Sequence, residues 1–280
     1  MADQIEITEE ILGEYTMEKR IRLIASDMDG TLLQEYGAKC SDELFELICR
    51  LEEKGVCFVA ASGRQYTNLQ RLFGPVDDKV LYLCENGALV MHLNQALLKR
   101  YFEDGLALEL CHAVYEQPEC EVLISGERTS YLIPKQSSFV TYIRDEVGND
   151  ITIIDKPERI SEPILKVSFY TQRQYRDHAT EELNKQFKDR CQIMTSGNEW
   201  VDFAPFGTNK GLVLAELGRQ LGIEPEEMAA FGDNENDRSM LELVGHPYIM
   251  ENCNPSIRNI SGTRCRRVET ELRKILNNLS

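Results

Sequence analysis

The clearest pattern in the sequence is an alternation of short apolar runs with amphipathic segments. The runs at residues 21–27 and 55–63 are almost continuously apolar and end in small or polar residues, as is typical of parallel strands buried on both faces. Between residues 44 and 51 the apolar positions recur at i, i+3, i+4 and i+7, which predicts a helix. Ser41 is placed to cap its start and Gly55 its end, so this part of the chain is expected to form a strand, a helix and a second strand.

The same alternation returns further along the chain. Strands are expected at residues 79–87, 226–233 and 246–251, and helices at residues 210–222 and 236–245. Strands that alternate with helices predict an α/β fold with a doubly wound, Rossmann-like parallel sheet. Ligands of such sheets bind beyond the carboxyl ends of the strands.

The middle of the chain has a different pattern, which mixes strand and helix candidates without strict alternation. Strands are expected at residues 120–127, 164–171, 190–196 and 199–205, and helices at residues 104–117 and 175–187. This predicts an inserted α+β domain whose sheet is open on one face.

The predicted domains are therefore a discontinuous core formed by residues 1–102 and 207–280, and an inserted domain formed by residues 103–206. Residues 1–20 are interpreted as an N-terminal extension of the core. Within the insertion, Trp200 and Phe203 are expected to be core residues.

Composition narrows the possible partners. With 31 Lys+Arg against 47 Asp+Glu, the formal charge of −16 disfavours binding to nucleic acid or to an anionic membrane surface. The nine cysteines include no C-x-x-C pair, and no apolar stretch approaches about 18 residues, so we expect a cytoplasmic protein. A small molecule is the expected partner, and the chain is expected to be a monomer or a weak homo-oligomer. The four histidines share no ligand-like spacing and are interpreted as structural.

Asp27 and Asp29 pose a problem of electrostatics. If the strand continued through them, side chains at i and i+2 would lie on the same face, where like charges repel. The repulsion would be relieved by a cation between them, by protonation of one acid, or by an end of the strand before the two side chains.

Four polar stretches each follow a predicted strand or open a predicted helix. They are residues 27–31, 62–64, 209–211 and 232–237. Free backbone N–H groups at such places bind phosphate. Each stretch alone is weak evidence for a site, but their common place at the strand ends of one sheet predicts that they act together.

In order along the chain, these four stretches together with residues 85–88 read D-x-D-G-T-L, S-G-R, E-N-G-A, K-G and G-D-x-x-N-D. This order resembles that of the haloacid dehalogenase-like (HAD) phosphatases, and in particular the Cof-type subfamily with an α+β (C2B-type) cap. The resemblance extends from Ile21 through nearly the whole chain. It departs from the family pattern at residues 251–256 and near residues 261–272, away from the motifs.

The resemblance implies a Mg2+-dependent phosphatase that hydrolyses a small phosphorylated metabolite, such as a sugar phosphate, through an aspartyl-phosphate intermediate. It implies that Asp27 is the nucleophile and Asp29 the general acid/base. The implied metal ligands are Asp27, Asp29 and Asp233. The implied phosphate-binding residues are Met28, Ser62, Gly63, Lys210 and Asn236. The implied supporting residues are Gly30, Thr31, Arg64 and Asp237.

The chemistry of these side chains is consistent with those roles. Mg2+ prefers hard oxygen ligands, which the carboxylates of Asp27 and Asp233 and a backbone carbonyl at Asp29 would supply. Lys210 would add positive charge beside a phosphate.

Neighbouring side chains are expected to complete the site. Ser62 and the amide of Asn236 would donate to the phosphate, and Thr31 would orient Asp29. Gly30 would allow a tight turn, and Asp237 would hold Lys210 or waters on the metal.

Two other functions remain open from the residues. A sugar phosphomutase would use the same nucleophile. A receiver-type phospho-accepting module would also use acids, a hydroxyl, a lysine and Mg2+, but it would not need an inserted domain of about 100 residues.

Overall fold

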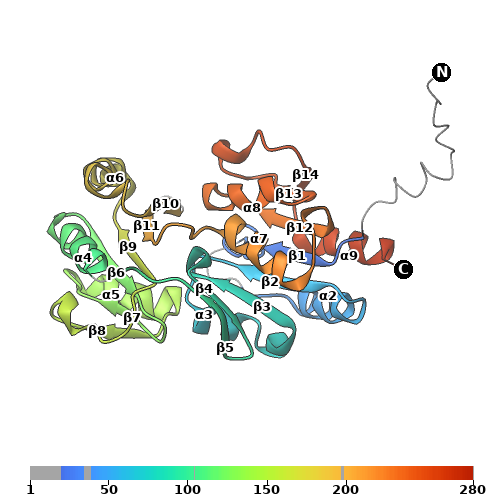
Figure 1. Ribbon diagram of the computed structural model, residues 1–280, viewed down its shortest axis with the longest axis horizontal. Coiled ribbons are helices and arrows are strands. Elements are labelled where there is room, and N and C mark those ends of the chain that lie inside the picture. Colours follow the sequence, from blue (N-terminus) through green and yellow to red (C-terminus); the bar gives the residue numbers. More distant parts are fainter. Residues whose placement is uncertain (1–19, 35–38, 104, 197–198, 280) are drawn as a thin grey trace, which may run out of the picture.

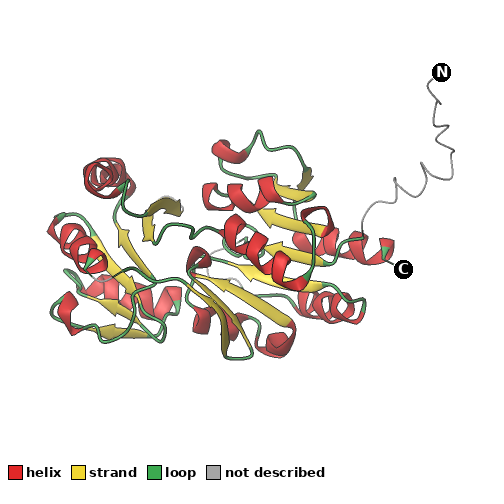
Figure 2. Ribbon diagram, viewed as in Figure 1, coloured by secondary structure: helices red, strands yellow, loops and turns green. Residues whose placement is uncertain are grey.

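The computed structural model describes residues 20–34, 39–103, 105–196 and 199–279. The chain forms two sheets, each with its own helices, which lie side by side (Figures 1 and 2). The expected N-terminal extension falls outside the described residues except for Arg20.

The larger sheet has the strand order β14-β13-β12-β1-β2-β3-β4-β5. Its strands are β1 (Leu23–Ser26), β2 (Cys57–Ala61), β3 (Val80–Cys84), β4 (Leu89–His92), β5 (Gln95–Lys99), β12 (Met228–Gly232), β13 (His246–Met250) and β14 (Thr263–Cys265). The pairings from β14 to β3 are parallel, which confirms the predicted fold class. The antiparallel hairpin β4–β5 at one edge was not expected.

Helices cover both faces of this sheet. They are α2 (Asp42–Glu53), α3 (Tyr66–Leu72), α7 (Lys210–Leu221), α8 (Arg238–Leu243) and α9 (Val268–Asn278). Ile24 of β1 belongs to the core cluster that contains residues of α2, α3 and α9. Its neighbours Leu23 and Ala25 belong to the cluster that contains residues of α7 and α8. Because successive side chains of a strand point to opposite faces, a strand buried on both sides reads as a continuous apolar run.

The predicted caps of α2 are present. Ser41 Oγ accepts a hydrogen bond from the backbone N–H of Leu44 at 3.2 Å. Gly55 follows the helix with a φ of +75°, a conformation that favours glycine.

The smaller sheet has the strand order β10-β11-β9-β6-β7-β8. Its strands are β6 (Glu121–Ser125), β7 (Ser130–Leu132), β8 (Ile151–Ile153), β9 (Lys166–Tyr170), β10 (Gln192–Ser196) and β11 (Trp200–Ala204). Its helices are α4 (Leu106–Glu116), α5 (Ser137–Thr141) and α6 (Arg173–Phe187). We call this part of the molecule the cap.

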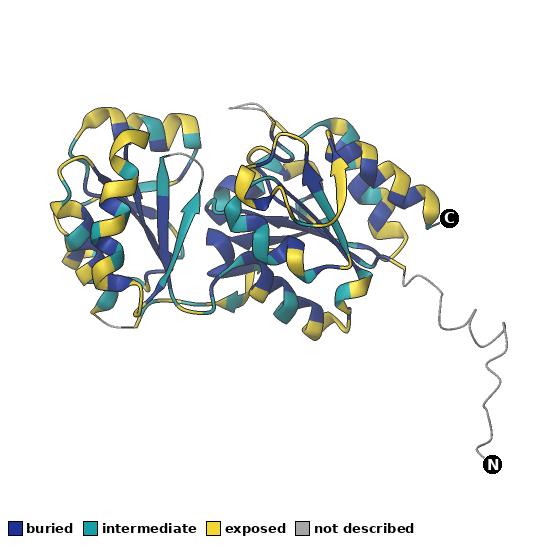
Figure 3. Ribbon diagram, turned by 90° about the horizontal axis from the view of Figure 1, so that it is seen from above, coloured by how far each residue is buried: buried dark blue, intermediate teal, exposed yellow. Residues whose placement is uncertain are grey.

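One face of the cap sheet is covered, and the other is covered in part and otherwise lines a cavity. Phe169 and Phe203 pack in one buried cluster with residues of α4 and α6. On the opposite face, Leu123 and Leu132 pack with Phe139 of α5, and Lys166 and Trp200 line the cavity described below. The expectation of an open-faced sheet therefore holds only beside the cavity, and buried residues concentrate inside each part of the molecule (Figure 3).

The expectation that Trp200 and Phe203 are both core residues is half wrong. Phe203 is fully buried, whereas Trp200 is half-buried and lines the cavity. The two residues are three positions apart on β11, so their side chains lie on opposite faces of the sheet.

The domain boundaries proposed near residues 102 and 206 fall in the two connections between the sheets, and we keep them as proposed boundaries.

All nine cysteines carry free thiols. Within the described ranges, no helix is both long and apolar enough to cross a bilayer.

Candidate active site

A cavity of about 1060 Å³ lies where the open face of the cap sheet meets the strand ends of the larger sheet. Residues that directly follow β1, β2, β3 and β12 line it, as expected for ligand binding at the carboxyl ends of parallel strands. Of the predicted site residues, the lining includes Asp27, Asp29, Ser62, Gly63, Arg64, Asp233 and Asn236. The others are not part of the lining: Gly30 is exposed, and the buried residues are Met28, Thr31, Lys210 and Asp237.

The strand β1 ends at Ser26, so Asp27 and Asp29 do not share one strand face. The Asp27 side chain is buried against Lys210, whose Nζ lies 2.5 Å from Asp27 Oδ1. The Asp29 side chain is 60% exposed and pairs with Arg64, with Nε donating to Oδ2 at 2.8 Å and Nη2 to Oδ1 at 2.5 Å. The two side chains therefore diverge, and each acid has its own cationic partner. Relief of the repulsion by a metal ion stays a prediction.

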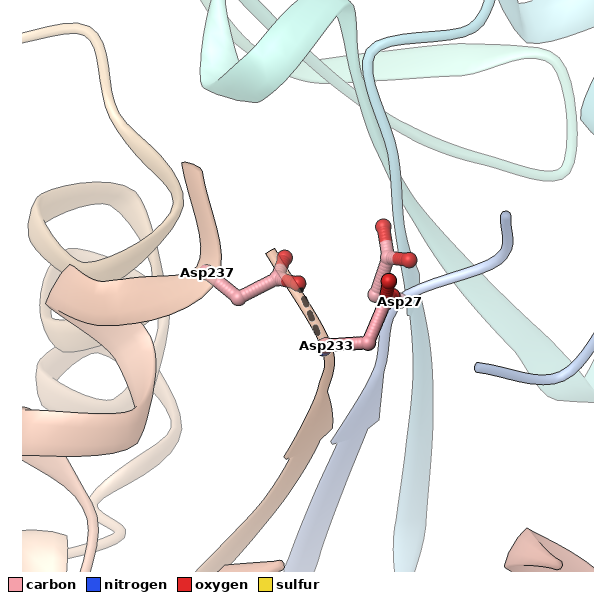
Figure 4. A group of neighbouring side chains, drawn as sticks. All are labelled: Asp27, Asp233 and Asp237. Atoms are coloured by element: carbon pink, nitrogen blue, oxygen red, sulfur yellow. Dashed lines mark hydrogen bonds between the residues drawn. The ribbon is translucent and has the colours of Figure 1, made fainter. Parts of the chain in front are cut away.

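Asp27 lies in a group of three acids with Asp233 and Asp237, in which one carboxylate oxygen from each residue lies within 4.8 Å of the other two (Figure 4). Asp237 also binds Lys210, with 2.6 Å between Oδ1 and Nζ. Its Oδ2 accepts hydrogen bonds from the backbone N–H groups of Asp233 and Asn234 at 3.0 Å each. Both oxygens of Asp237 are therefore engaged, which agrees with the prediction that it holds Lys210.

Crowding of these acids changes their protonation. Burial, reinforced by the charge of Asp237, raises the pKa of Asp27 well above its usual range, although Lys210 opposes the shift. Burial and the charge of Asp237 also raise the pKa of Asp233 to about 6. Burial alone would lower the pKa of Lys210, but Asp237 and Asp27 more than offset it and raise that pKa. Since one lysine faces three acids, the site favours a further positive charge.

Gly30 and Thr31 position Asp233, which corrects one prediction. Thr31 Oγ1 donates to Asp233 Oδ1 at 2.8 Å, so it orients Asp233 and not Asp29. Gly30 has a φ of +86°, and a Cβ at this position would overlap the carboxylate of Asp233. The turn after β1 therefore requires glycine both for its conformation and for its contact with β12.

The predicted phosphate-binding residues differ in their surroundings. Ser62 Oγ accepts from the backbone N–H of Arg64 at 3.2 Å, and Asn236 Nδ2 donates to Asn86 Oδ1 at 3.1 Å. The Met28 side chain is fully buried in the core, so only its backbone could contact a phosphate. Lys210 is fully buried and reaches the site through its contact with Asp27.

A buried polar network at the junction of core and cap was missed in the sequence. Lys166 Nζ lies 2.9 Å from Glu85 Oε2 and 3.5 Å from Asp202 Oδ1, and it donates to the carbonyl of Gly63 at 2.8 Å. Asn86 Nδ2 donates to Asp202 Oδ2 at 2.7 Å. The network thus connects two strands of the cap to the Ser-Gly-Arg turn and to the residues after β3.

One signal in the sequence pointed to part of this network. The E-N-G-A stretch was noted as a motif but given no role. Glu85 and Asn86 have φ values of +51° and +55°, a conformation that non-glycine residues adopt rarely and most often at functional sites. Lys166 and Asp202 lie inside ordinary strand patterns, so nothing in the local sequence distinguishes them.

A second contact between core and cap lies on α3. The Asn68 side chain donates to the carbonyl of Val147, and Arg71 Nη1 donates to the carbonyl of Gly148 at 2.6 Å. Arg64 Nη1 also donates to Asn68 Oδ1 at 2.9 Å. Arg64, which pairs with Asp29, is thereby connected to residues 147–148 of the cap, which line the cavity.

The geometry can be compared with known proteins. A family model described as haloacid dehalogenase-like hydrolase matches residues 24–267. The chain belongs to this family. The predicted HAD fold, the Cof-type assignment and the assignment as a phosphoric monoester hydrolase are thereby confirmed.

Three similar proteins illustrate the family. The "5-amino-6-(5-phospho-D-ribitylamino)uracil phosphatase YbjI" of Escherichia coli (strain K12) is 23% identical over 85% of this chain and 88% of its own length. An "HMP-PP phosphatase" of Escherichia fergusonii is 28% identical over 85% of this chain and 86% of its own. The solved structure of a haloacid dehalogenase-like hydrolase from B. subtilis superimposes with a TM-score of 0.80 at 19% identity, covering 90% of this chain and 99% of the other.

Proposed function

We propose that the protein is a Mg2+-dependent phosphatase that hydrolyses small phosphate monoesters through an aspartyl-phosphate formed on Asp27. The observation that carries the proposal is the position of Asp27. It directly follows the central strand β1, 2.5 Å from Lys210 and beside two further acids, and it lines the cavity between core and cap. A carboxylate can attack an anionic phosphoryl group only where positive charge offsets their repulsion.

The donor set fits Mg2+. Mg2+ prefers hard oxygen ligands, which the carboxylates here supply. The three clustered acids carry more negative charge than the one lysine among them can neutralise. Both oxygens of Asp237 are engaged by Lys210 and backbone N–H groups, which leaves Asp27 and Asp233 as the proposed side-chain ligands. The backbone carbonyl of Asp29 remains the proposed third ligand. When bound, the metal would supply positive charge beside the phosphoryl oxygens.

The chain's own residues would carry out two displacements. In the first, an oxygen of Asp27 forms a bond to phosphorus while the bond to the ester oxygen breaks, and Asp29 gives its proton to that leaving oxygen. In the second, Asp29 takes a proton from a water that attacks phosphorus, which releases inorganic phosphate and restores Asp27. Lys210 stabilises the carboxylate of Asp27 before the first displacement and again when the second restores it.

Arg64 holds Asp29 at the edge of the cavity between these steps. Because the Asp29 side chain is 60% exposed, it has room to turn toward the leaving oxygen. The polar network around Lys166 and the contacts of α3 hold the cap over the cavity and limit the entry of water.

The cavity is of the size that encloses one small metabolite. Small phosphorylated metabolites are therefore the proposed substrates, in agreement with the names of the two phosphatases to which the chain is similar.

Release of inorganic phosphate from a panel of small phosphate esters tests the proposal. We expect Mg2+-dependent turnover that excess EDTA abolishes, and no turnover by Asp27→Asn, which loses the nucleophile at almost unchanged volume. Wild-type-like turnover by Asp27→Asn, with an unchanged circular dichroism spectrum, would refute the covalent mechanism. Isomerised sugar phosphate that depends on a bisphosphate primer, in place of released phosphate, would show a phosphomutase.

A second variant tests the metal ligand. Asp233→Ala should raise the Mg2+ concentration needed for half-maximal turnover, and excess Mg2+ should restore part of the rate. A variant with reduced turnover but an unchanged Mg2+ requirement would exclude Asp233 as a ligand.

A further inference from the structure

The wall of the cavity formed by the cap is aromatic. Trp200 and Tyr142 both line the cavity, with their ring centroids 6.5 Å apart and their planes within 25° of parallel. Tyr170 packs against both rings, with centroids 5.1 Å from Tyr142 and 5.1 Å from Trp200, and Phe139 packs against Tyr170 at 5.6 Å. Trp200 is thus supported by other rings on the protein side while remaining half-buried on the cavity side.

The aromatic wall lies between a part of the cap core and the cavity. Val201 and Phe203 supply the apolar contacts of β11 to α4 and α6, and Trp200 and Asp202 point the other way. Trp200 packs there against the buried cluster of Leu123, Leu132, Phe139 and Ile143, and its remaining surface lines the cavity, where it is available to a ligand.

A polar group without a partner lies in the same cavity. Asn149 is nine-tenths buried and lines the cavity. Its Nδ2 donates to Ser130 Oγ at 3.1 Å, but its Oδ1 has no hydrogen-bond partner among the described residues. Since a buried acceptor left unpaired is destabilising, this oxygen is suited to accept a hydrogen bond from a ligand.

We propose that Trp200, Tyr142 and Asn149 form a subsite for the leaving group, and that this subsite selects phosphate esters that carry a planar nitrogen heteroaromatic ring with an N–H donor. The aromatic wall would stack on the ring, and Asn149 Oδ1 would accept from the N–H group. The inference rests on the proposed function, because it assigns the part of the substrate that remains after phosphate is removed.

The groups at the aromatic wall match a planar ring that carries a donor. The carboxylate of Asp202 already accepts from Ser168 at 2.5 Å, from Ser196 at 2.7 Å and from Asn86 at 2.7 Å. Trp200 and Tyr142 line the cavity as rings, and Asn149 Oδ1 is an acceptor without a partner among the described residues, so an aromatic ring with an N–H group can use both kinds of contact.

The first experiment compares two esters that share a ribityl phosphate and differ in the ring. They are 5-amino-6-(5-phospho-D-ribitylamino)uracil and ribitol 5-phosphate. We expect Trp200→Ala to lower kcat/KM for the ring-bearing ester about 10- to 100-fold more than for ribitol 5-phosphate, the usual effect of losing one stacked base. Trp200→Phe, which keeps a ring, should restore most of the difference, and Asn149→Ala should lower the same ratio about 3- to 10-fold.

Tyr175→Ala is the matched control. Tyr175 is exposed on α6, which packs on the face of the cap sheet opposite to the cavity. This variant should leave the ratio of the two kcat/KM values unchanged.

The second experiment measures binding without turnover. Trp200 is the single tryptophan of the chain, so its fluorescence reports directly on the subsite. In the Asp27→Asn variant, the ring-bearing ester should quench this fluorescence with saturation, and Asn149→Ala in the same background should weaken the apparent affinity. Ribitol 5-phosphate should give little quenching.

The outcomes separate the two proposals. If wild-type protein releases phosphate from both esters but Trp200→Ala and Asn149→Ala lower both kcat/KM values equally, the subsite is refuted and the proposed function stands. If saturable quenching occurs but no phosphate ester is hydrolysed, the proposed function is refuted and the subsite stands. A larger effect of Trp200→Ala on glucose 6-phosphate than on the uracil ester would overturn the choice of ring in favour of a sugar.

Discussion

Replacing Lys166 with methionine removes the cation that pairs with both Glu85 and Asp202. The side chains of Lys166, Glu85 and Asp202 are 6%, 3% and 4% exposed respectively, so water reaches little of the two acids. Methionine keeps the length and much of the volume of lysine, so the variant tests the charge more than the packing.

The magnitude follows from what each acid retains. Glu85 loses its 2.9 Å ion pair and keeps a hydrogen bond from Ser125 Oγ at 2.9 Å. Asp202 loses a longer contact of 3.5 Å and keeps its bonds from Ser168, Ser196 and Asn86. Most of the loss therefore falls on Glu85. Removing one partner of a buried ion pair costs about 3 to 5 kcal/mol, and we expect a decrease of this size in the free energy of unfolding.

Urea unfolding measures this decrease. Circular dichroism reports on the unfolding of the whole chain, and the fluorescence of Trp200 reports on the cap. Lys185→Met is the control, because Lys185 is an exposed lysine of α6 whose ion pairs lie on the surface. It should change the free energy of unfolding by less than about 1 kcal/mol. The double variant Lys166→Met with Glu85→Gln should recover part of the loss, because it removes the unpaired charge.

A midpoint for Lys166→Met that equals the wild-type midpoint would contradict the reasoning. It would mean that Glu85 and Asp202 reach water when the lysine is lost, and hence that the cap does not remain closed over them in solution. A loss of stability that Glu85→Gln fails to reduce would assign the effect to packing instead of charge.

Three further predictions concern the acids of the site. Asp29→Asn should lower turnover about 100- to 10,000-fold. The loss should be larger for an alkyl phosphate than for 4-nitrophenyl phosphate, because the leaving group of the latter needs no proton. Equal losses for the two esters in steady-state assays would exclude general acid catalysis by Asp29. Gly30→Ala should lower the melting temperature and raise the Mg2+ concentration needed for turnover. Gly55→Ala is the control, because Gly55 has a similar φ of +75° but no atom within 4 Å of an added Cβ. It should lower the melting temperature only. The pKa of Asp233 in the folded protein is raised to about 6. Above pH 6 the charged carboxylate of Asp233 therefore destabilises the metal-free fold, and protonation of Asp233 removes this destabilisation as the pH falls toward 4. In EDTA, Asp233→Asn should therefore be more stable than wild type at pH 7 by on the order of 2 kcal/mol, and thermal unfolding at pH 4 to 5 should show the advantage lost; an advantage independent of pH would contradict the shift.

Local patterns in the sequence were sufficient for most of the core. Strands buried on both faces and helices with one apolar stripe are dictated by nearest neighbours along the chain, as in β1 and α2. The hairpin β4–β5 was missed because its second strand is largely exposed and lacks a clear alternation. Its turn residues Leu93 and Asn94 have positive φ values without a glycine to mark them.

The site could be predicted as a set of motifs but not as a set of contacts. Thr31 was assigned to Asp29, two positions before it, yet its hydroxyl reaches Asp233 across the sheet. The network of Glu85, Lys166 and Asp202 joins three strands from two parts of the molecule, so no spacing in the sequence reveals it. Contacts between core and cap depend on how the two pack together, which periodicity does not encode.

The insertion of the cap also has a consequence for how the chain reaches its native state. Leu23 of the central strand β1 pairs with Met228 of β12, across the entire cap, whereas the cap strands from β6 to β11 are contiguous in the sequence. Pairings between such distant segments form slowly, because a long loop must close before they contribute stability. During synthesis the cap can fold while β1 still lacks β12, and Asp27 and Asp233 meet only after Asp233 itself has emerged. We therefore expect the proposed metal site to be among the last parts of the protein to form, and newly made chains to gain activity after they gain most of their secondary structure.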